Sequence, residues 1–82
     1  MNNSLTKFRD EIDLVDEELI LLLKKRIEIT RKVREYKIKN NLPLEDLNRE
    51  KEIIERLSSY GVPKELIEKI YVQIFNHSKC QK

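Results

Sequence analysis

An arginine interrupts an apolar stripe in the first half of the sequence. Apolar residues recur at steps of three and four on both sides of Arg26, as on the buried face of a helix packed against other helices. Lys37 follows eleven residues later, about three helical turns, and therefore lies within about 20° of the same face. Glu50 and Ser78 fall on the apolar stripes of two later segments. Because an isolated inward charge costs several kcal/mol, these residues need partners or a ligand.

The inward polar residues offer more hydrogen-bond donors than acceptors. This surplus favours an anionic ligand, and arginine suits the bidentate capture of a carboxylate. Two other interpretations stay open: Arg26 pairs with Glu50 across a helix bundle, or Lys37 extends to solvent from the end of its helix. The set consists of Arg26, Lys37, Glu50, Ser78 and either Gln81 or Lys82.

Other kinds of catalytic site find little support. His77 and Ser78 have no acid at a suitable spacing for a Ser/His/Asp triad. Cys80 is the single cysteine, so the chain can form neither an intrachain disulfide nor a structural zinc site with its one histidine. A chain with one glycine has no phosphate-binding loop. We therefore expect no metal and no other cofactor.

Three helices account for the pattern. The first is predicted from Ser4, a suitable N-cap, to about Lys39, where the stretch NNLPLED stops it. Asp46 is a good N-cap for a second helix that continues to Gly61. Pro63 fits the first turn of a third helix, which runs to the C-terminus. The predicted fold is all-α, one domain over the whole chain, with a long, a short and a medium helix.

The first helix is too long for its own chain to cover. About 36 residues give a rod of about 54 Å, whereas a compact chain of 82 residues has a radius of gyration of about 12 Å. Since the apolar stripe runs its full length, we expect a second copy to bury the remainder in an intertwined homodimer. The predicted inward apolar residues are Leu5, Phe8, Ile12, Val15, Leu19, Leu22, Ile29, Val33 and Tyr36 on the first helix, Leu47, Ile54, Leu57 and Tyr60 on the second, and Ile67, Tyr71 and Ile74 on the third.

Composition restricts the partners and the compartment. The 17 basic and 15 acidic residues are interleaved, so neither nucleic acid nor an anionic membrane is an expected partner. No window approaches the roughly 18 uninterrupted apolar residues that span a membrane, and the first residues lack the apolar run of a signal peptide. We expect a soluble, cytoplasmic protein.

The sequence resembles the all-helical class of chorismate mutases in four segments. In order, these are FRDEID, LLKKRIEI, VREYKIKNNLPLEDLNREKEIIERL and LIEKIYVQIFNHS. The most specific part is the pattern K-x5-P-x2-D-x2-RE, from Lys37 to Glu50. The resemblance covers nearly the whole chain. It implies an intertwined dimer of three-helix chains that rearranges chorismate to prephenate, the committed step towards phenylalanine and tyrosine.

The resemblance also implies roles for the basic residues of the first helix. Arg26 would bind a carboxylate of chorismate, and Lys37 would donate to its ether oxygen and help to hold a carboxylate. Arg9 would reach from this helix into the site of the partner chain. Arg9 precedes Arg26 by 17 residues, about 100° round the helix, so a site in another chain is geometrically sensible for it.

The later residues complete the implied site. Glu50 would accept a hydrogen bond from the ring hydroxyl, and Ser78 would lie near the ring carboxylate. The family often places a glutamine four residues after this serine as a second donor to the ether oxygen. Counting without gaps gives Lys82, and Gln81 lies one residue earlier, so either residue fits this role. The residues implied to shape the region of the ring hydroxyl are Asp46, Arg49 and Glu50.

Two alternative functions stay open. Isochorismate-pyruvate lyase is built on the same helical fold and also binds a dicarboxylate through arginines, although the D-x2-RE segment supports the mutase. A non-catalytic helical dimerisation module would bind no dicarboxylate. Prephenate formation from chorismate, pyruvate release from isochorismate, or neither reaction separates the three.

Overall fold

Three α-helices make up most of the structure. The computed structural model describes residues 3–80, in which α1 spans Asn3–Lys39, α2 spans Leu47–Leu57 and α3 spans Lys64–Cys80, with a short 3-10 helix, η1, at Ser58–Tyr60. Residues 3–80 contain no strand. The α-helices have 37, 11 and 17 residues. The predicted all-α fold with a long, a short and a medium helix is therefore confirmed.

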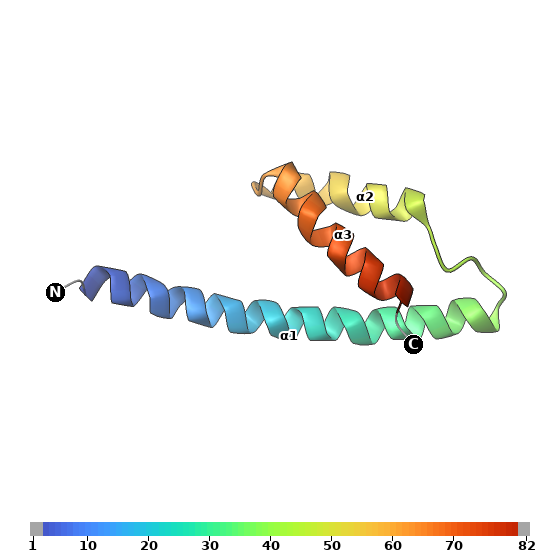
Figure 1. Ribbon diagram of the computed structural model, residues 1–82, viewed down its shortest axis with the longest axis horizontal. Helices are drawn as coiled ribbons and strands as arrows, with labels where there is room; N and C mark the ends of the chain where they lie inside the picture. The colour runs from blue at the N-terminus through green and yellow to red at the C-terminus, as the bar shows by residue number, and fades with distance from the viewer. Residues whose placement is uncertain (1–2, 81–82) are drawn as a thin grey trace.

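The long helix α1 supports the other two over only part of its length. In Figure 1, α2 lies above the C-terminal part of α1, and α3 descends from the far end of α2 to reach α1. The N-terminal part of α1 projects beyond them as an arm, which we define as residues 3–22. The molecule measures 60 × 23 × 16 Å, with a radius of gyration of 16.6 Å. This elongated shape agrees with the length predicted for the first helix.

Local signals end α1 and begin α2. Asn41 adopts a left-handed conformation with φ 56°, which asparagine tolerates better than most residues. Leu42 N–H then donates to the Lys37 carbonyl at 2.8 Å, which closes the end of α1. Asp46 caps α2 as predicted, because its carboxylate accepts a hydrogen bond from Arg49 N–H at 2.9 Å.

The other predicted helix ends shift by a few residues. Ser4 is not the N-cap of α1, because the helix already includes Asn3. The α-helical part of the second helix ends at Leu57, and η1 continues the chain to Gly61, whose φ of 85° favours glycine. Pro63 precedes the first residue of α3, and its carbonyl accepts from Ile67 N–H at 3.1 Å.

A small apolar core holds α2 and α3 together. Its buried side chains are Ile53 of α2 and Ile67 and Phe75 of α3, which are 6–8% exposed. Tyr71 packs its ring against Phe75 with centroids 5.6 Å apart and planes inclined at 57°. Burial of these side chains stabilises the packing of α2 against α3.

The predicted inward stripe of the second helix is wrong at both ends. Leu47 is 63% and Tyr60 74% exposed, and Ile53, not its neighbour Ile54, is buried. Ile53 and Ile54 lie about 100° apart round the helix, so the buried face of α2 is turned by about one residue from the predicted stripe. The 3-10 turn also winds at about 3.0 residues per turn, which moves Tyr60 off the α-helical stripe.

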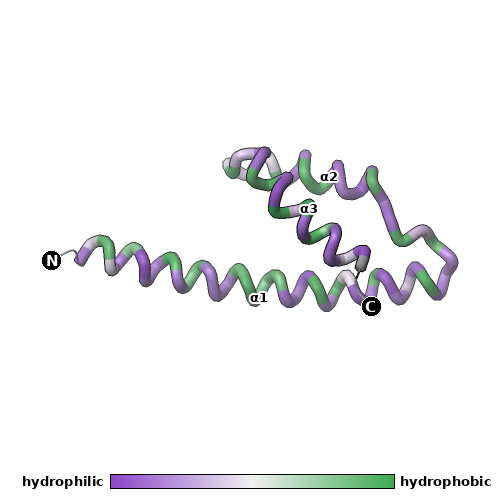
Figure 2. Tube along the Cα trace, viewed as in Figure 1, coloured by the Kyte–Doolittle hydropathy of each residue, from purple (hydrophilic) through white to green (hydrophobic). Residues whose placement is uncertain are grey.

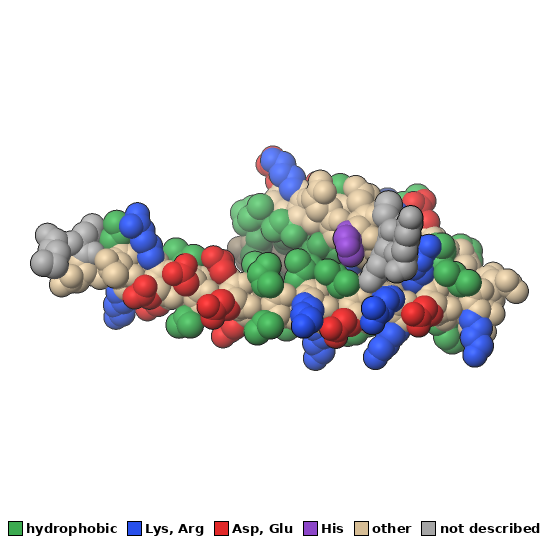
Figure 3. Space-filling model, turned by 60° about the horizontal axis from the view of Figure 1, so that its bottom comes forward, with side chains coloured by type: hydrophobic (Ala, Val, Ile, Leu, Met, Phe, Trp, Pro, Cys, Tyr) green, Lys and Arg blue, Asp and Glu red, His purple; other side chains and the backbone are tan. Residues whose placement is uncertain are grey.

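The apolar side chains of α1 stay largely open within the single chain. No residue of α1 is buried, and Phe8, Val15 and Leu22 on the arm are 57–65% exposed. Figure 2 shows apolar and polar residues alternating along the whole helix, and Figure 3 shows hydrophobic side chains gathered where the α2–α3 pair meets α1. None of the described helices combines the length and apolar character needed to cross a membrane. The half-buried face of α1 comprises Leu23, Arg26, Ile27, Thr30, Arg34 and Lys37.

We predict that Ile67→Ala destabilises the fold by about 2–5 kcal/mol, because it removes one of the few fully packed side chains. Denaturant unfolding followed by circular dichroism measures the change. Glu68→Ala, at the adjacent exposed position, is the matched control. A loss no larger than that of the control would contradict the place of Ile67 in the core.

Candidate active site

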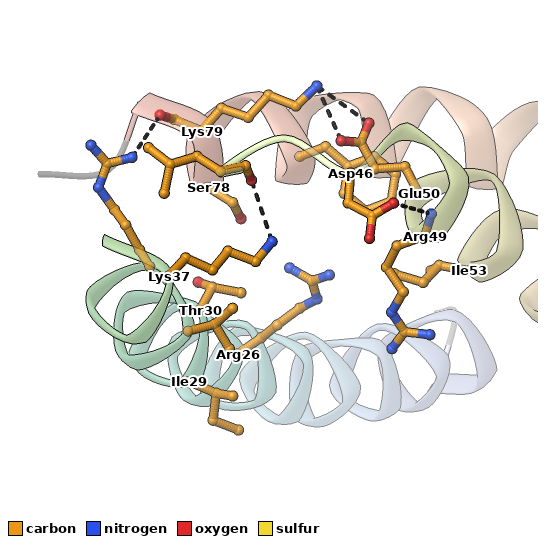
Figure 4. Close-up of a pocket in the computed structure, with 14 residues that line it drawn as sticks. Arg26, Ile29, Thr30, Lys37, Asp46, Arg49, Glu50, Ile53, Ser78 and Lys79 are labelled. Atoms are coloured by element: carbon orange, nitrogen blue, oxygen red, sulfur yellow. Dashed lines mark hydrogen bonds and ion pairs between the residues drawn. The ribbon is translucent and has the colours of Figure 1, made fainter. Parts of the chain in front are cut away.

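A cavity of about 320 Å³ lies between the three α-helices. Its volume is at the lower end of the range for small-molecule sites, about 300–1,000 Å³. Figure 4 shows side chains of α1 forming one wall and those of α2 and α3 forming the opposite wall. The predicted site residues that line it together are Arg26, Lys37, Asp46, Arg49, Glu50 and Ser78.

Arg26 is held by aromatic rings and not by an acid. Its guanidinium carbon lies 5.7 Å from the centroid of the Tyr71 ring and 5.9 Å from that of Phe75. Such cation–π contacts contribute about 0.5–2 kcal/mol. Among the described residues Glu50 pairs with Lys79, so the interpretation that Arg26 and Glu50 neutralise each other is wrong. Within residues 3–80 no ion pair joins the guanidinium to a carboxylate, so it can bind an anion.

Lys37 lies in the last turn of α1 and is half-buried at the cavity. Its ammonium donates to the Leu44 carbonyl at 3.4 Å, a long hydrogen bond that uses one of its three donors. Figure 4 shows this side chain reaching across the cavity from the same wall as Arg26. The interpretation that Lys37 extends to solvent is therefore wrong, and within residues 3–80 two of its donors remain for a ligand.

The segment from Asp46 to Glu50 supplies the opposite wall. Both oxygens of Glu50 contact the Lys79 ammonium, at 3.1 and 3.3 Å, and its side chain is 21% exposed. Asp46 lines the cavity and caps α2 through Arg49 N–H. The Arg49 guanidinium pairs at 2.8 Å with Glu52, and both side chains are more than half exposed. Of the three residues in the predicted hydroxyl region, Glu50 is the best placed acceptor.

Ser78 belongs to the cavity, but its hydroxyl serves its own helix. The hydroxyl donates to the Ile74 carbonyl at 3.0 Å, which leaves the oxygen able to accept a hydrogen bond. Gln81 and Lys82 lie outside the described residues. Arg9 is exposed on the arm, about 26 Å along the axis from Arg26, and does not line the cavity of its own chain.

Two charged lining residues, Arg34 and Lys79, were not anticipated from the sequence. Arg34 donates to the main-chain carbonyl of Lys79 at 3.1 Å, and the Lys79 ammonium contacts Glu45 at 3.0 Å as well as Glu50. Hydrogen bonds that the ammonium donates to Glu45 and then to Glu50 raise the pKa of Lys79 above its usual value. The position of Arg34, three residues before Lys37, could have revealed it. No spacing signal marks Lys79.

The electrostatic arrangement favours a small anion that also carries a hydrogen-bond donor. Arg26 and Lys37 present positive charge on one wall, and Glu50 presents carboxylate oxygens on the other. Within the described part of the chain, no three His, Cys, Asp or Glu side chains are grouped to hold a metal ion. The cavity can therefore bind a carboxylate at one side and a hydroxyl at the other through its own side chains.

We predict that Asp46→Ala lowers the free energy of unfolding by about 1 kcal/mol, because Arg49 N–H loses its partner at the start of α2. Asp46→Asn keeps a side-chain oxygen at the cap and should cost only a few tenths of that amount. Thermal and denaturant unfolding of both variants provide the measurement. Equal losses would show that the capping oxygen does not account for the effect.

Comparison with known proteins assigns a family to this arrangement. The family described as chorismate mutase type II matches residues 8–82. A bifunctional chorismate mutase/prephenate dehydratase of Buchnera aphidicola (subsp. Schizaphis graminum) is 42% identical over 59 residues, which cover 72% of this chain and 15% of the relative. The protein of the same name from Aquifex aeolicus is 37% identical over 79 residues, 88% of this chain and 22% of the relative.

A third relative is the T-protein of Enterobacter agglomerans, which is 36% identical over 78 residues, 90% of this chain and 21% of the relative. The chain thus spans between 15% and 22% of the length of these relatives. No solved structure is significantly similar to it. The matched residues include every described residue that lines the cavity. The chain therefore belongs to the chorismate mutase type II family.

Proposed function

We propose that this chain rearranges chorismate to prephenate, in the synthesis of phenylalanine and tyrosine, without a cofactor. The observation that carries the proposal is the convergence of Arg26, Lys37 and Glu50 on one cavity in a chain of this family. Chorismate carries two carboxylates, an ether oxygen and a ring hydroxyl. Two cations facing a carboxylate complement these groups.

The reaction requires binding and electrostatic stabilisation more than proton transfer. The ether C–O bond breaks while a C–C bond forms, with no atom gained or lost. Negative charge grows on the ether oxygen in the transition state, where the Lys37 ammonium stabilises it. Arg26 binds a carboxylate and holds the enolpyruvyl arm in the folded conformer, while Glu50 accepts a hydrogen bond from the ring hydroxyl. Tyr71 and Phe75 keep the guanidinium of Arg26 in place.

The remaining proposed contacts follow the family resemblance. Ser78 lies near the ring carboxylate, and Asp46 and Arg49 shape the region of the ring hydroxyl. Their positions on the cavity lining support this assignment. Gln81 supplies a second donor to the ether oxygen, with Lys82 as the alternative.

A second copy of the chain completes the proposed site. The arm of α1 leaves Phe8, Val15 and Leu22 more than half exposed, and a partner arm packed along it would bury them. Arg9 lies on the same arm and is distant from the cavity of its own chain. We therefore propose an intertwined homodimer in which each Arg9 binds substrate in the partner's cavity.

The proposed compartment is the cytoplasm, and the proposed ligand is a small soluble dianion. Cys80 as the only cysteine allows no intrachain disulfide and fits a reducing compartment. Neither nucleic acid nor a membrane is a proposed partner, because acidic and basic residues are interleaved along the chain.

We predict that Lys37→Ala lowers kcat about a hundredfold, equivalent to about 3 kcal/mol, because one donor to the ether oxygen is lost. Chorismate consumption followed by ultraviolet absorbance, with identification of prephenate, measures the activity. Lys32→Ala, an exposed lysine of the same helix, is the matched control and should retain activity. Arg26→Leu should keep the helical content while substrate affinity collapses.

The same assay separates the alternative functions. Unchanged turnover in Lys37→Ala would remove this residue from the mechanism. Pyruvate release from isochorismate without prephenate formation would replace the mutase by the lyase. A chain that binds no dicarboxylate, and in which Arg26→Leu has no effect beyond stability, would be a non-catalytic module.

We predict that two inactive variants restore activity when their subunits are mixed. In a dimer of Arg9→Ala with Arg26→Leu, one site contains both unchanged arginines and the other contains neither. Random exchange of subunits should therefore recover about a quarter of the unmodified activity, since half of the dimers carry one intact site. Sedimentation of the unmodified protein should give twice the 9.9 kDa chain mass. A folded monomer, or no recovery after confirmed exchange, would contradict a shared site.

A further inference from the structure

Lys79 is held at both of its ends. Its main-chain carbonyl accepts a hydrogen bond from Arg34 of α1 at 3.1 Å. Its ammonium contacts Glu45, before α2, at 3.0 Å and Glu50, in α2, at 3.1 and 3.3 Å. The last described turn of α3 is thereby joined to the other two walls of the cavity.

The contact with Glu50 leaves this carboxylate able to bind a ligand. Each carboxylate oxygen has two lone pairs, and a single ammonium occupies at most one on each. Figure 4 shows the Lys79 side chain running along the top of the cavity to Glu50, on the opposite side from Arg26 and Lys37. The ammonium therefore fixes the direction of the Glu50 oxygens without filling the cavity.

The surroundings of Lys79 keep it charged and in place. Its side chain is 29% exposed, against 55% for Glu45 and 21% for Glu50, so the contact with Glu50 is the less solvated of the two. Lysine is already a cation at neutral pH, and the hydrogen bonds to Glu45 first and then to Glu50 raise the pKa of Lys79 further. A permanent cation next to two acids holds both of them near α3.

We propose that Lys79 is a positioning residue that orients the Glu50 carboxylate towards the ring hydroxyl of the substrate and so sets the affinity for the hydroxylated ring. The inference rests on the proposed function, because it takes Glu50 as the acceptor of that hydroxyl. It assigns to Lys79 an indirect effect that is specific to one group of the ligand. A purely structural role would affect all ligands equally.

The test uses two non-rearranging dicarboxylate analogues of chorismate, one with the ring hydroxyl and one without it. Calorimetry with the full chain measures the affinity of each analogue. Lys79→Met should weaken binding of the hydroxylated analogue about tenfold, because the acceptor loses its orientation, and change binding of the deoxy analogue less than about twofold. Lys79→Arg, which restores a cation, should return the affinity to within about threefold of the original value.

Two matched variants separate positioning from packing. Lys69→Met removes an exposed lysine of the same helix that pairs with Glu65 at 3.2 Å and does not line the cavity, and should leave both affinities unchanged. Glu45→Gln weakens the ion pair between Lys79 and residue 45 but leaves the contact between Lys79 and Glu50. The preference for the hydroxylated analogue should therefore persist. Thermal unfolding of each variant verifies that the fold is intact.

The outcomes distinguish this inference from the proposed function. If the unmodified protein binds neither analogue and leaves chorismate unchanged, the proposed function fails and the role of Lys79 fails with it. If it binds both analogues and Lys79→Met weakens both equally or neither, only the role of Lys79 is overturned. A loss of the hydroxyl preference in Glu45→Gln as large as in Lys79→Met would also overturn it.

Discussion

The contact between Arg26 and the two aromatic rings of α3 is the interaction on which the site depends. Arg26 occupies the apolar face of α1, and it can remain there because Tyr71 and Phe75 lie within 6 Å of its guanidinium. The contact brings α3 against α1, and the apolar core of Phe75, Ile67 and Ile53 brings α2 with it. A cation in the packing face thus determines where the cavity forms.

The carboxylates that line the described cavity come from the α2 side and none from α1. α1 contributes Arg26 and Lys37, whereas the segment that begins at Asp46 contributes the carboxylates, including Glu50. In the described part of the chain, neither Arg26 nor Lys37 forms an ion pair with these carboxylates. Lys79 joins the two walls, with its carbonyl towards α1 and its ammonium towards Glu50. Glu50 and Lys79 therefore join the helices and also line the cavity, and Asp46 caps α2 and lines the cavity as well.

The sequence was most informative where structure is local. The periodicity of the first helix, the N-cap at Asp46 and the stop near Gly61 rest on neighbours within a few residues, and the structure agrees with them. Helical spacing also identified Arg26, Lys37 and Glu50 as inward polar residues, and they line one cavity. Two errors concern packing, because Leu47 and Tyr60 are exposed. One error is local, because Ser4 lies inside the helix that it was expected to cap.

Sequence alone established the three helices, their polar inward positions and the resemblance to a family, because periodicity, capping and motif order are properties of the linear chain. The partner of each polar side chain depends instead on how the helices cross. A rotation of about 100°, one residue of helix, selects a different neighbour. This is why only the packed arrangement revealed three contacts. They are the ion pair of Glu50 with Lys79, the contact of Arg26 with aromatic rings, and the hydrogen bond from Arg34 to the Lys79 carbonyl.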